Sequence, residues 1–447
     1  MTDGFSTVLV ANRGEIAVRV ARACREMGIR VIGVRSSADP EPAVARLADR
    51  VVHIGPAAPK RSYLNGSAVI QAALMTGAEA IHPGYGFLSE DADFAAACAE
   101  SGLVFIGPRP DVLHRLGDKA LARTAMAAAG VPLLPGSIEP ARDLVDAKRI
   151  ADDIGYPAVI KAVAGGGGRG ITVVRTAAEF AEAFRATTTE AQILFGDGRV
   201  YVERYLPDAR HVEVQVLCDR YGNAVHLGER DCTTQRRHQK LIEETPAPGL
   251  PRELLDRMSE AAVRGVLAVG YEGAGTVEFL VDSAHEFHFL EVNCRIQVEH
   301  PVTEMVTGID LVRQQLHIAA GGKLPFTQRD IRPRGAAIEC RINAEDPDRD
   351  FAPAPGVLRE FSPPTGPFVR LDTHVYPGYR IPAAYDSLIA KLIVWGADRE
   401  TALKRAMFAL DEFRISGDGV KTTVGYLAAV LADPAFSAQT GDLGVSR

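Results

Sequence analysis

Residues 1–117 alternate short apolar segments with longer amphipathic ones, and this alternation restricts the possible folds more than any other feature of the chain. The apolar segments of strand length are 7–11, 30–35, 51–54, 78–82 and 103–106. The stretch after the first of them, residues 14–27, carries apolar side chains at helical spacing and ends before Gly28. Strands that alternate with helices build parallel sheets, so the sequence predicts a doubly wound α/β fold here.

The first strand-to-helix turn decides whether this sheet binds a dinucleotide. The turn reads Asn12-Arg13-Gly14-Glu15 and holds a single glycine. Dinucleotide sites need the pattern GxGxxG, because its glycines let the backbone approach the pyrophosphate. The sequence therefore argues against NAD binding in this segment.

The composition argues against several other classes of function. A net charge of −7 does not suit a nucleic-acid-binding protein, because a phosphate-binding face needs an excess of Lys and Arg. The six cysteines are scattered without a CxxC pair, which does not suit a zinc site or a disulfide framework. The first residues lack the pattern of a signal peptide, and no run approaches the ~18 apolar residues of a membrane span. We therefore expect a cytoplasmic enzyme that has neither nucleic acid nor membrane as a partner.

The length of 447 residues suits two or three domains. The α/β pattern stops near residue 117, and the segment 327–335 is rich in Arg, Pro and Gly, as domain connections often are. We therefore expect domains at 1–117, 118–330 and 331–447, the last of them α+β. Asp118 suits the N-cap of an Ala-rich helix that ends at Gly130, and a small module follows at 131–205.

A glycine run stands inside that small module. Four consecutive glycines, 165–168, follow Lys161 and precede an apolar segment at 171–174. Such a run lets backbone N–H groups approach an anion closely, and the lysine adds a positive charge beside it. A Walker loop is excluded, because it must lead into a helix and carry Lys-Ser or Lys-Thr after its last glycine. A phosphate-binding loop and a flexible hairpin tip both remain open.

Two acidic strand candidates, 276–281 and 286–293, flank a polar turn. When that turn closes a hairpin, position 278 lies opposite about position 289, and alternate residues share its face. The oxygen donors that converge on this face are Glu278, Glu291 and Asn293. Such donors suit Mg²⁺ or Mn²⁺ when nucleotide phosphates complete the coordination shell. A register shift of one residue would separate them and leave ordinary acidic surface residues.

Arg295, Gln297 and Glu299 occupy alternate positions just after this hairpin. An extended segment would point all three the same way, where they could hold a small planar anion such as bicarbonate and take its proton. A structural salt bridge between Arg295 and Glu299 is the alternative.

Three further patterns carry less information. The basic run 235–240 lies between two strand candidates and is either a solvated loop or a clamp for a polyanion. Cys232 has no evident base at a fixed spacing, which indicates a structural thiol. His285 and His288 stand three apart in a strand pattern, which is not the helical HExxH of zinc proteases.

Taken together, these segments resemble the biotin carboxylase family, the ATP-grasp subunits of acetyl-CoA carboxylase and related acyl-CoA carboxylases. The matching motifs are ANRGEIA at 11–17, IHPGYGFLSE at 81–90, GDK at 117–119, GGGGRG at 165–170, ERDCTTQRRHQK at 229–240, NCRIQVEHPVTEM at 293–305 and ECRINAEDP at 339–347. The likeness covers nearly the whole chain, and HPGYGFLSE and RIQVEHPVTE are highly specific. It implies an ATP-grasp core with a mobile lid at about 131–205, between the N-terminal α/β domain and a C-terminal α+β domain.

The resemblance implies a role for each matching position. ATP would be bound by Lys119, Lys161, Gly167, Gly168, Glu203, Arg204, Leu206, His211, Gln235 and His238. Mg²⁺ or Mn²⁺ would be bound by Glu278, Glu291 and Asn293. Bicarbonate would be held by Lys240, Arg295, Gln297 and the backbone of Val298, with Glu299 as its base. Arg341 would stabilise the biotin enolate, and Tyr85 lies in the loop that resembles the biotin-side wall.

The sequence departs from the family pattern at three positions. Ala164 replaces a usual glycine before the glycine run, Cys294 replaces a usual Thr, and Arg204 replaces a usual Lys. We expect Cys294 to point away from the metal face, and none of the three changes removes a group with a chemical role.

The resemblance also implies partners: a biotin carboxyl carrier protein, carboxyltransferase subunits, most directly those of acetyl-CoA carboxylase in fatty acid synthesis, and a second copy of the chain in a homodimer. A biotin attachment site normally reads Met-Lys-Met, and no Met here is followed by Lys. We therefore expect biotin to arrive on another chain.

Two other functions compete with this interpretation. An ATP-grasp half of a carbamoyl-phosphate synthetase would share the phosphate and metal residues but not IHPGYGF or RIQVEHP. A non-catalytic scaffold would be expected to lack some of the reactive residues, yet the chain has Lys240, Arg295, Glu299 and Arg341.

Overall fold

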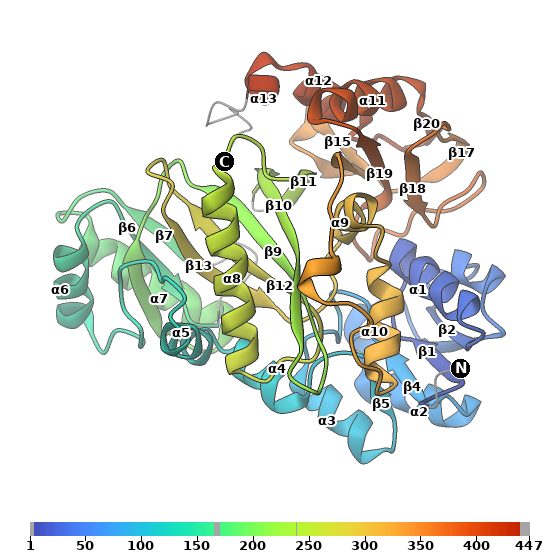
Figure 1. Cartoon of the computed structure of the whole chain (residues 1–447), viewed down its shortest axis with the longest axis horizontal. Helices are drawn as coiled ribbons and strands as arrows, with labels where there is room; N and C mark the ends of the chain where they lie inside the picture. Colours follow the sequence, from blue (N-terminus) through green and yellow to red (C-terminus); the bar gives the residue numbers. More distant parts are fainter. Residues whose placement is uncertain (1–3, 165–169, 238, 439–447) are drawn as a thin grey trace.

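The computed structural model describes residues 4–164, 170–237 and 239–438. Its N-terminal part is a five-stranded parallel sheet in the order β3-β2-β1-β4-β5, coloured blue in Figure 1. The strands are β1 (Thr7–Val10), β2 (Arg30–Ser36), β3 (Arg50–Gly55), β4 (Ala80–His82) and β5 (Val104–Phe105). The helices between them are α1 (Gly14–Glu26), α2 (Gly66–Thr76) and α3 (Ala92–Glu100), with short 3-10 helices at η1 (Ala43–Arg46) and η2 (Pro59–Arg61). The doubly wound prediction is confirmed.

Two helices, α4 (Pro110–Gly117) and α5 (Lys119–Ala128), lead out of this sheet. Asp118 caps α5 as the sequence predicted, because its carboxylate accepts the backbone N–H groups of Ala120 and Leu121 at 2.8 and 3.0 Å. The cap fixes the start of the helix, and with it the place of Lys119 in the first turn.

The next part is a small module with its own core, at the left of Figure 1. Its three-stranded antiparallel sheet has the order β7-β6-β8. The elements are α6 (Leu144–Ile154), β6 (Ala158–Ala162), β7 (Ile171–Val174), α7 (Phe180–Phe195) and β8 (Val200–Arg204). The glycines predicted to close on phosphate, Gly167 and Gly168, lie outside the described residues.

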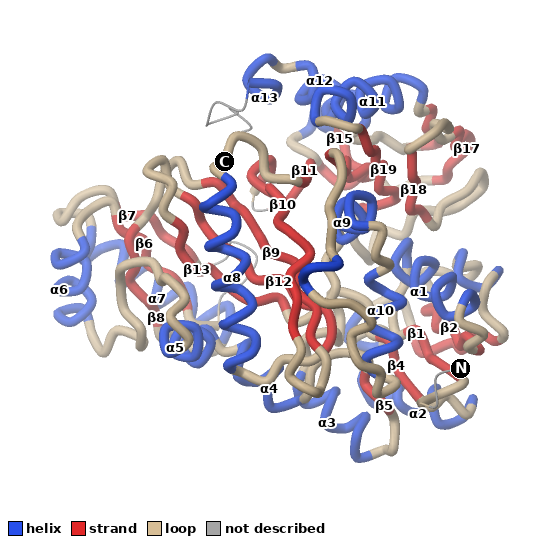
Figure 2. The backbone as a smooth tube through the Cα atoms, viewed as in Figure 1, coloured by secondary structure: helices blue, strands red, loops and turns tan. Residues whose placement is uncertain are grey.

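An eight-stranded antiparallel sheet joins the middle of the chain to its C-terminal part, in the order β13-β12-β9-β10-β11-β14-β19-β18. Its strands are β9 (Arg210–Cys218), β10 (Ala224–Arg236), β11 (Gln239–Thr245), β12 (Gly273–Val281), β13 (Phe287–Asn293), β14 (Ala336–Asn343), β18 (Val369–Thr373) and β19 (Leu388–Gly396). Figure 2 shows these strands extending from β13 toward β18. The sheet crosses the boundary that we predict at residues 330 and 331, because β11 pairs with β14 through Ile242 and Cys340.

Helices and short strands complete the structure. Against the large sheet or beside it lie α8 (Arg252–Ala268), α9 (His300–Thr307), α10 (Leu311–Ala319), and the 3-10 helices η3 (Gln328–Asp330) and η4 (Pro347–Arg349). The C-terminal part adds β15 (Glu345–Asp346), β16 (Ala352–Pro353), β17 (Val357–Ser362), β20 (Arg414–Asp418), α11 (Arg399–Glu412), α12 (Val424–Ala432) and α13 (Pro434–Ala438). Among the described residues, no helix is both long and apolar enough to cross a bilayer.

The register of the β12–β13 hairpin differs from the predicted one. Glu278 pairs with Glu291 and not with Phe289, which pairs with Phe279. Leu290 is the extra residue of a β-bulge between these two pairs. The predicted register was therefore wrong by two residues, and because two is the period of a strand, Glu278 and Glu291 still share a face.

Candidate active site

A cavity of about 1670 Å³ opens between the N-terminal part, the small module, and the large sheet. Most of the predicted site residues line it: Tyr85, Lys119, Lys161, Glu203, Arg204, Leu206, His211, Gln235, Lys240, Glu278, Glu291, Asn293, Arg295, Gln297, Val298 and Arg341. Glu299 lies fully buried behind the wall, in contact with Lys240. His238 lies outside the described residues. One cavity thus gathers residues that are far apart in the sequence.

The small-module end of the cavity carries lysines. Lys161 lies on β6, and its Nζ is 2.5 Å from Glu203 on β8. The other oxygen of Glu203 is 2.6 Å from Arg123 on α5, a buried cation that the sequence analysis missed. Burial lowers the pKa of Lys119, although Glu291 works against this shift. Through its two oxygens, Glu203 holds Lys161 and Arg123 at a cavity wall that can face phosphate.

Arg204 points away from this end. Its guanidinium donates to the carbonyl of Ile154, at the end of α6, with Nε at 3.0 Å. The Arg204 side chain, in the position of the usual Lys, therefore lies against the small module.

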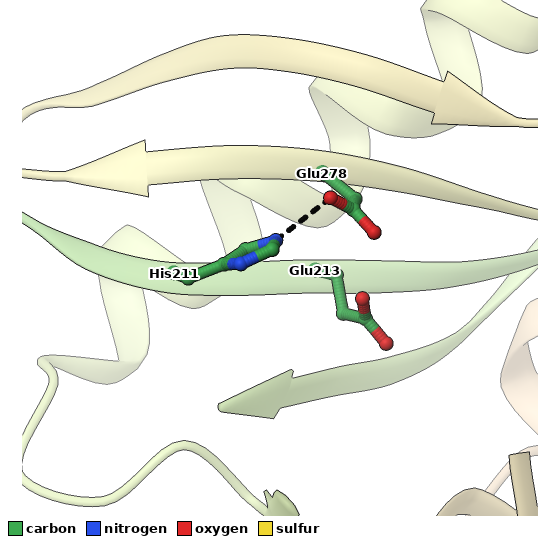
Figure 3. A group of neighbouring side chains, drawn as sticks. All are labelled: His211, Glu213 and Glu278. Atoms are coloured by element: carbon green, nitrogen blue, oxygen red, sulfur yellow. Dashed lines mark hydrogen bonds and ion pairs between the residues drawn. The ribbon is translucent and has the colours of Figure 1, made fainter. Parts of the chain in front are cut away.

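Carboxylates of the acidic hairpin and of the neighbouring strand β9 lie close together, and Figure 3 draws three side chains of this cluster, His211, Glu213 and Glu278. His211 Nε2 lies 2.8 Å from a carboxylate oxygen of Glu278, and the Asn293 amide donates to the other oxygen at 2.9 Å. Burial opposes the charge of His211, but Glu278 raises the pKa of this imidazole. The predicted nucleotide ligand His211 and the predicted metal ligand Glu278 are therefore direct partners.

Glu213 is the member of this cluster that the sequence analysis missed. It lies one alternation after His211 on β9 and is fully buried, with its oxygens 2.5 Å from Arg230 Nε and 2.6 Å from Lys240 Nζ. The alternation of His211, Glu213 and Gln215 with valines in a buried strand is the signal that could have found it. Each of its oxygens pairs with a cation, so Glu213 acts as a counter-ion to Arg230 and Lys240.

Lys240 lies at the centre of the carboxylates. Its Nζ is 2.6 Å from Glu213, 3.1 Å from Glu278 and 2.6 Å from Glu299. Burial opposes its charge, but Cys232 and the three carboxylates together raise the pKa of Lys240 well above its ordinary value. The ammonium stays charged, so an anion that enters here meets a fixed positive group.

Glu299 lies between two cations, Lys240 at 2.6 Å and Arg341 at 3.0 Å. Burial alone would raise its pKa, but these cations hold the pKa of Glu299 well below its ordinary value. The carboxylate is therefore ionised at neutral pH and can accept a proton. Cys232 lies 3.8 Å from it, and burial raises the pKa of this thiol, which fits the structural thiol that the sequence indicates.

Arg295 does not form the alternative salt bridge with Glu299. Its Nε donates to Glu90 at 2.7 Å, and its Nη1 donates to the side-chain oxygen of Gln297 at 2.9 Å. The chain also turns at 298–299 instead of staying extended, since α9 begins at His300. The prediction that Arg295 and Gln297 share a side is confirmed, whereas Glu299 reaches the site from the start of the helix.

Arg341 lies on β14 beside Glu299, the predicted base. Its Nε donates to Glu243 at 2.6 Å and its Nη2 to Glu299 at 3.0 Å. Glu243 lies on β11, is fully buried and was not predicted. The residue predicted to act on biotin is thus held against the residue predicted to deprotonate bicarbonate.

The oxygen donors of the hairpin fit a divalent cation. Glu278 and Glu291 are cross-strand neighbours, and the amide of Asn293 contacts Glu278. Although the Glu291 side chain opens into the cavity, desolvation there and then the facing Glu278 carboxylate raise its pKa. Mg²⁺ or Mn²⁺ prefers such hard oxygen ligands. Cys294, as predicted, points into the core and away from this face.

Three family models together match almost the whole chain. The description "Biotin carboxylase, N-terminal domain" matches residues 4–113, "Carbamoyl-phosphate synthase L chain, ATP binding domain" matches 118–327, and "Biotin carboxylase C-terminal domain" matches 339–445. Biotin carboxylase of Nostoc sp. is 52% identical over 97% of this chain and 96% of its own length.

Two solved structures resemble the fold closely. A biotin carboxylase from Campylobacter jejuni has a TM-score of 0.95 at 46% identity, covering 99% of this chain and 98% of the other. The biotin carboxylase domain dimer of Hydrogenobacter thermophilus 2-oxoglutarate carboxylase, in complex with MgADP, ADP and bicarbonate, has a TM-score of 0.93 at 46% identity, covering 98% and 96%. The flanking matches exclude a carbamoyl-phosphate synthetase half, and the chain belongs to the biotin carboxylase family.

Proposed function

We propose that the chain uses ATP and bicarbonate to carboxylate biotin through carboxyphosphate, the first half-reaction of a biotin-dependent carboxylase. One observation carries this proposal: Glu299 is held between Lys240 and Arg341, directly behind the wall of a cavity whose other end carries Lys119 and Lys161. A base, a fixed cation, and phosphate-binding lysines in one cavity are the groups that phosphorylation of bicarbonate needs.

In the first step, Glu299 acts as the base. Bicarbonate held by Lys240, Arg295 and Gln297 gives its proton to Glu299, and its oxygen attacks the γ-phosphorus of ATP as the bond to ADP breaks. Lys119 and Lys161 absorb the charge of the transferred phosphoryl group. Glu278, Glu291 and Asn293 would hold the divalent cation, which would neutralise phosphate charge.

The second step belongs to Arg341. Carboxyphosphate breaks down to CO₂ and phosphate, phosphate takes the ureido proton of biotin, and the biotin nitrogen captures CO₂. The guanidinium of Arg341 lies 3.0 Å from Glu299, so an anion formed beside the base falls within its reach. Closing the small module, residues 131–205, over the site keeps water from carboxyphosphate.

Wild-type protein is expected to cleave ATP only with Mg²⁺ or Mn²⁺, and faster when bicarbonate and biotin are both present. Carrier-borne biotin should be the better substrate, because tethering raises its effective concentration at the site. The measurement is phosphate release with free biotin, with a biotinylated carrier domain, and after EDTA. Equal rates with and without bicarbonate would overturn the function, and equal efficiency of free and carrier-borne biotin would overturn the carrier.

Arg341→Ser is expected to lower the rate of biotin carboxylation by about 100-fold while the KM for ATP changes by less than about twofold. The reason is its position, since Arg341 contacts Glu243 and Glu299 but neither lysine of the nucleotide end. The control is Arg359→Ser, at an exposed guanidinium paired with Asp418 on the same side of the boundary at 330 and 331. A loss of ATP affinity equal to the loss of rate would assign Arg341 to the nucleotide site instead.

The partners follow from the same proposal. We place the chain in the cytoplasm as a homodimer that works with a biotin carboxyl carrier protein and the carboxyltransferase subunits of acetyl-CoA carboxylase, in fatty acid synthesis. The dimer of the Hydrogenobacter domain supports the oligomeric state. Exposed Phe368 and Phe408, 54% and 71% accessible, offer apolar surface in the C-terminal part. The acceptor is tested by identifying the carboxyltransferase that co-purifies with the chain.

A further inference from the structure

Lys391 is a buried cation that the reaction scheme does not use. It lies in the middle of β19, whose other residues are uncharged, and its side chain has no exposed surface. A lysine is rarely fully buried unless it is paired. It does not line the cavity, so it lies behind the cavity wall.

The ammonium of Lys391 contacts three separate parts of the chain. It donates to the backbone carbonyl of Val298 at 2.8 Å and lies 3.1 Å from Glu15 on α1 and 3.9 Å from Asp372 on β18. In Figure 1 both α1 and α9 lie near the C-terminal strands, and their residues contact this part: α1 contacts β18 and β19, and α9 contacts β19. Burial opposes the charge, but Glu15, Glu339 and Asp372 raise the pKa of Lys391. The lysine is therefore a charged junction.

The junction reaches two walls of the cavity. Val298, whose carbonyl it holds, precedes the proposed base and belongs to the proposed bicarbonate loop. Glu15 accepts a hydrogen bond from the hydroxyl of Tyr85, which lines the proposed biotin side. In the sheet, Lys391 also pairs directly with Arg341. The Lys391 ammonium therefore contacts both the proposed bicarbonate loop, at Val298, and Glu15, the partner of Tyr85.

The pairing with Asp372 does not account for this lysine. Asp372 already accepts two hydrogen bonds from Arg370, at 2.9 and 2.7 Å, and the ammonium lies farther from it than from either other partner. Glu15 differs, because the oxygen that faces Lys391 is the same one that receives the Tyr85 hydroxyl. The short contacts of the lysine therefore go to the groups that hold the cavity wall.

We propose that Lys391 is a positioning residue that sets the bicarbonate loop through the Val298 carbonyl and the biotin wall through Glu15 and Tyr85, so that the two substrates are held in register. The inference rests on the proposed function and deepens it, because it assigns the coupling of two subsites to one buried contact. Misplacement of a reacting group by about 1 Å can cost about 100-fold in rate, so such a support has a kinetic effect.

Lys391→Met tests this proposal, because methionine keeps the length and apolar stem and removes the charge and the donor. The KM values for bicarbonate and for biotin should each rise about tenfold, while the KM for ATP changes by less than about twofold. Lys404→Met, at an exposed lysine paired with Glu400 on α11, is the matched control and should leave all three values unchanged. Unchanged KM values for bicarbonate and biotin in folded Lys391→Met would overturn the proposal.

Glu15→Gln separates the two arms and serves also where Lys391→Met does not fold. It keeps the size of the side chain and leaves the bond from Lys391 to Val298. It removes the negative charge that faces Lys391 and accepts the Tyr85 hydroxyl, so only the KM for biotin should rise. A rise in the KM for bicarbonate of the same size, or no rise in either, would contradict the separate arms.

The wild-type assay distinguishes a failure of the proposed function from a failure of the positioning role. Wild-type protein without bicarbonate-stimulated ATP cleavage would refute the proposed function itself. Normal wild-type activity with unaltered KM values in both variants would refute only the positioning role of Lys391.

Discussion

Glu299→Gln is expected to lower bicarbonate-dependent ATP cleavage and biotin carboxylation together, by about 100- to 10,000-fold. Glutamine has the shape of glutamate but cannot take a proton from bicarbonate. The fold should survive, because Lys240 keeps Glu213 and Glu278 as partners and Arg341 keeps Glu243. The measurement is phosphate release and carboxybiotin formation at saturating ATP, with circular dichroism to confirm folding.

The control for this variant is Glu100→Gln, an exposed position on α3, which should behave as wild type. ATP binding, measured by calorimetry, should be preserved in Glu299→Gln because the base does not line the nucleotide end. Folded Glu299→Gln with a normal rate would show that another group accepts the proton.

Glu291→Gln is the second substitution with a large expected effect, a fall in turnover of about 100-fold with a weaker apparent affinity for Mg²⁺. The amide keeps an oxygen but loses the negative charge that a hard cation prefers. Glu291 is open to the cavity and faces Glu278 across the hairpin, so its neutralisation removes a repulsion and should not lower the melting temperature. The measurement is turnover as a function of Mg²⁺ concentration.

Glu286 lies on the loop of the same hairpin, and its side chain is 59% exposed, so Glu286→Gln is the matched control. It should leave the Mg²⁺ dependence unchanged. Wild-type Mg²⁺ dependence in Glu291→Gln would remove this carboxylate from the metal site.

The β12–β13 hairpin shows which features of paired strands a local sequence pattern predicts and which it does not. Alternation predicts which side chains share a face, because the period of a strand is two residues. It does not predict which residues stand opposite each other, since that depends on the length of the turn and on bulges. Here the turn and the bulge at Leu290 each shift the register by one residue, and the two shifts together bring Glu291 to Glu278.

The sequence by itself determined the features that arise from neighbouring residues: the doubly wound N-terminal sheet, the Asp118 cap, the face that carries Glu278 and Glu291, and the motifs that resemble the family. Only the tertiary structure decided the ion pairs of the site. Arg295 pairs with Glu90 instead of Glu299, and Lys391 meets Glu15 from the other end of the chain. The packing of separate elements brings these partners together. The spacing of residues along the chain does not predict which distant charged groups will be buried side by side.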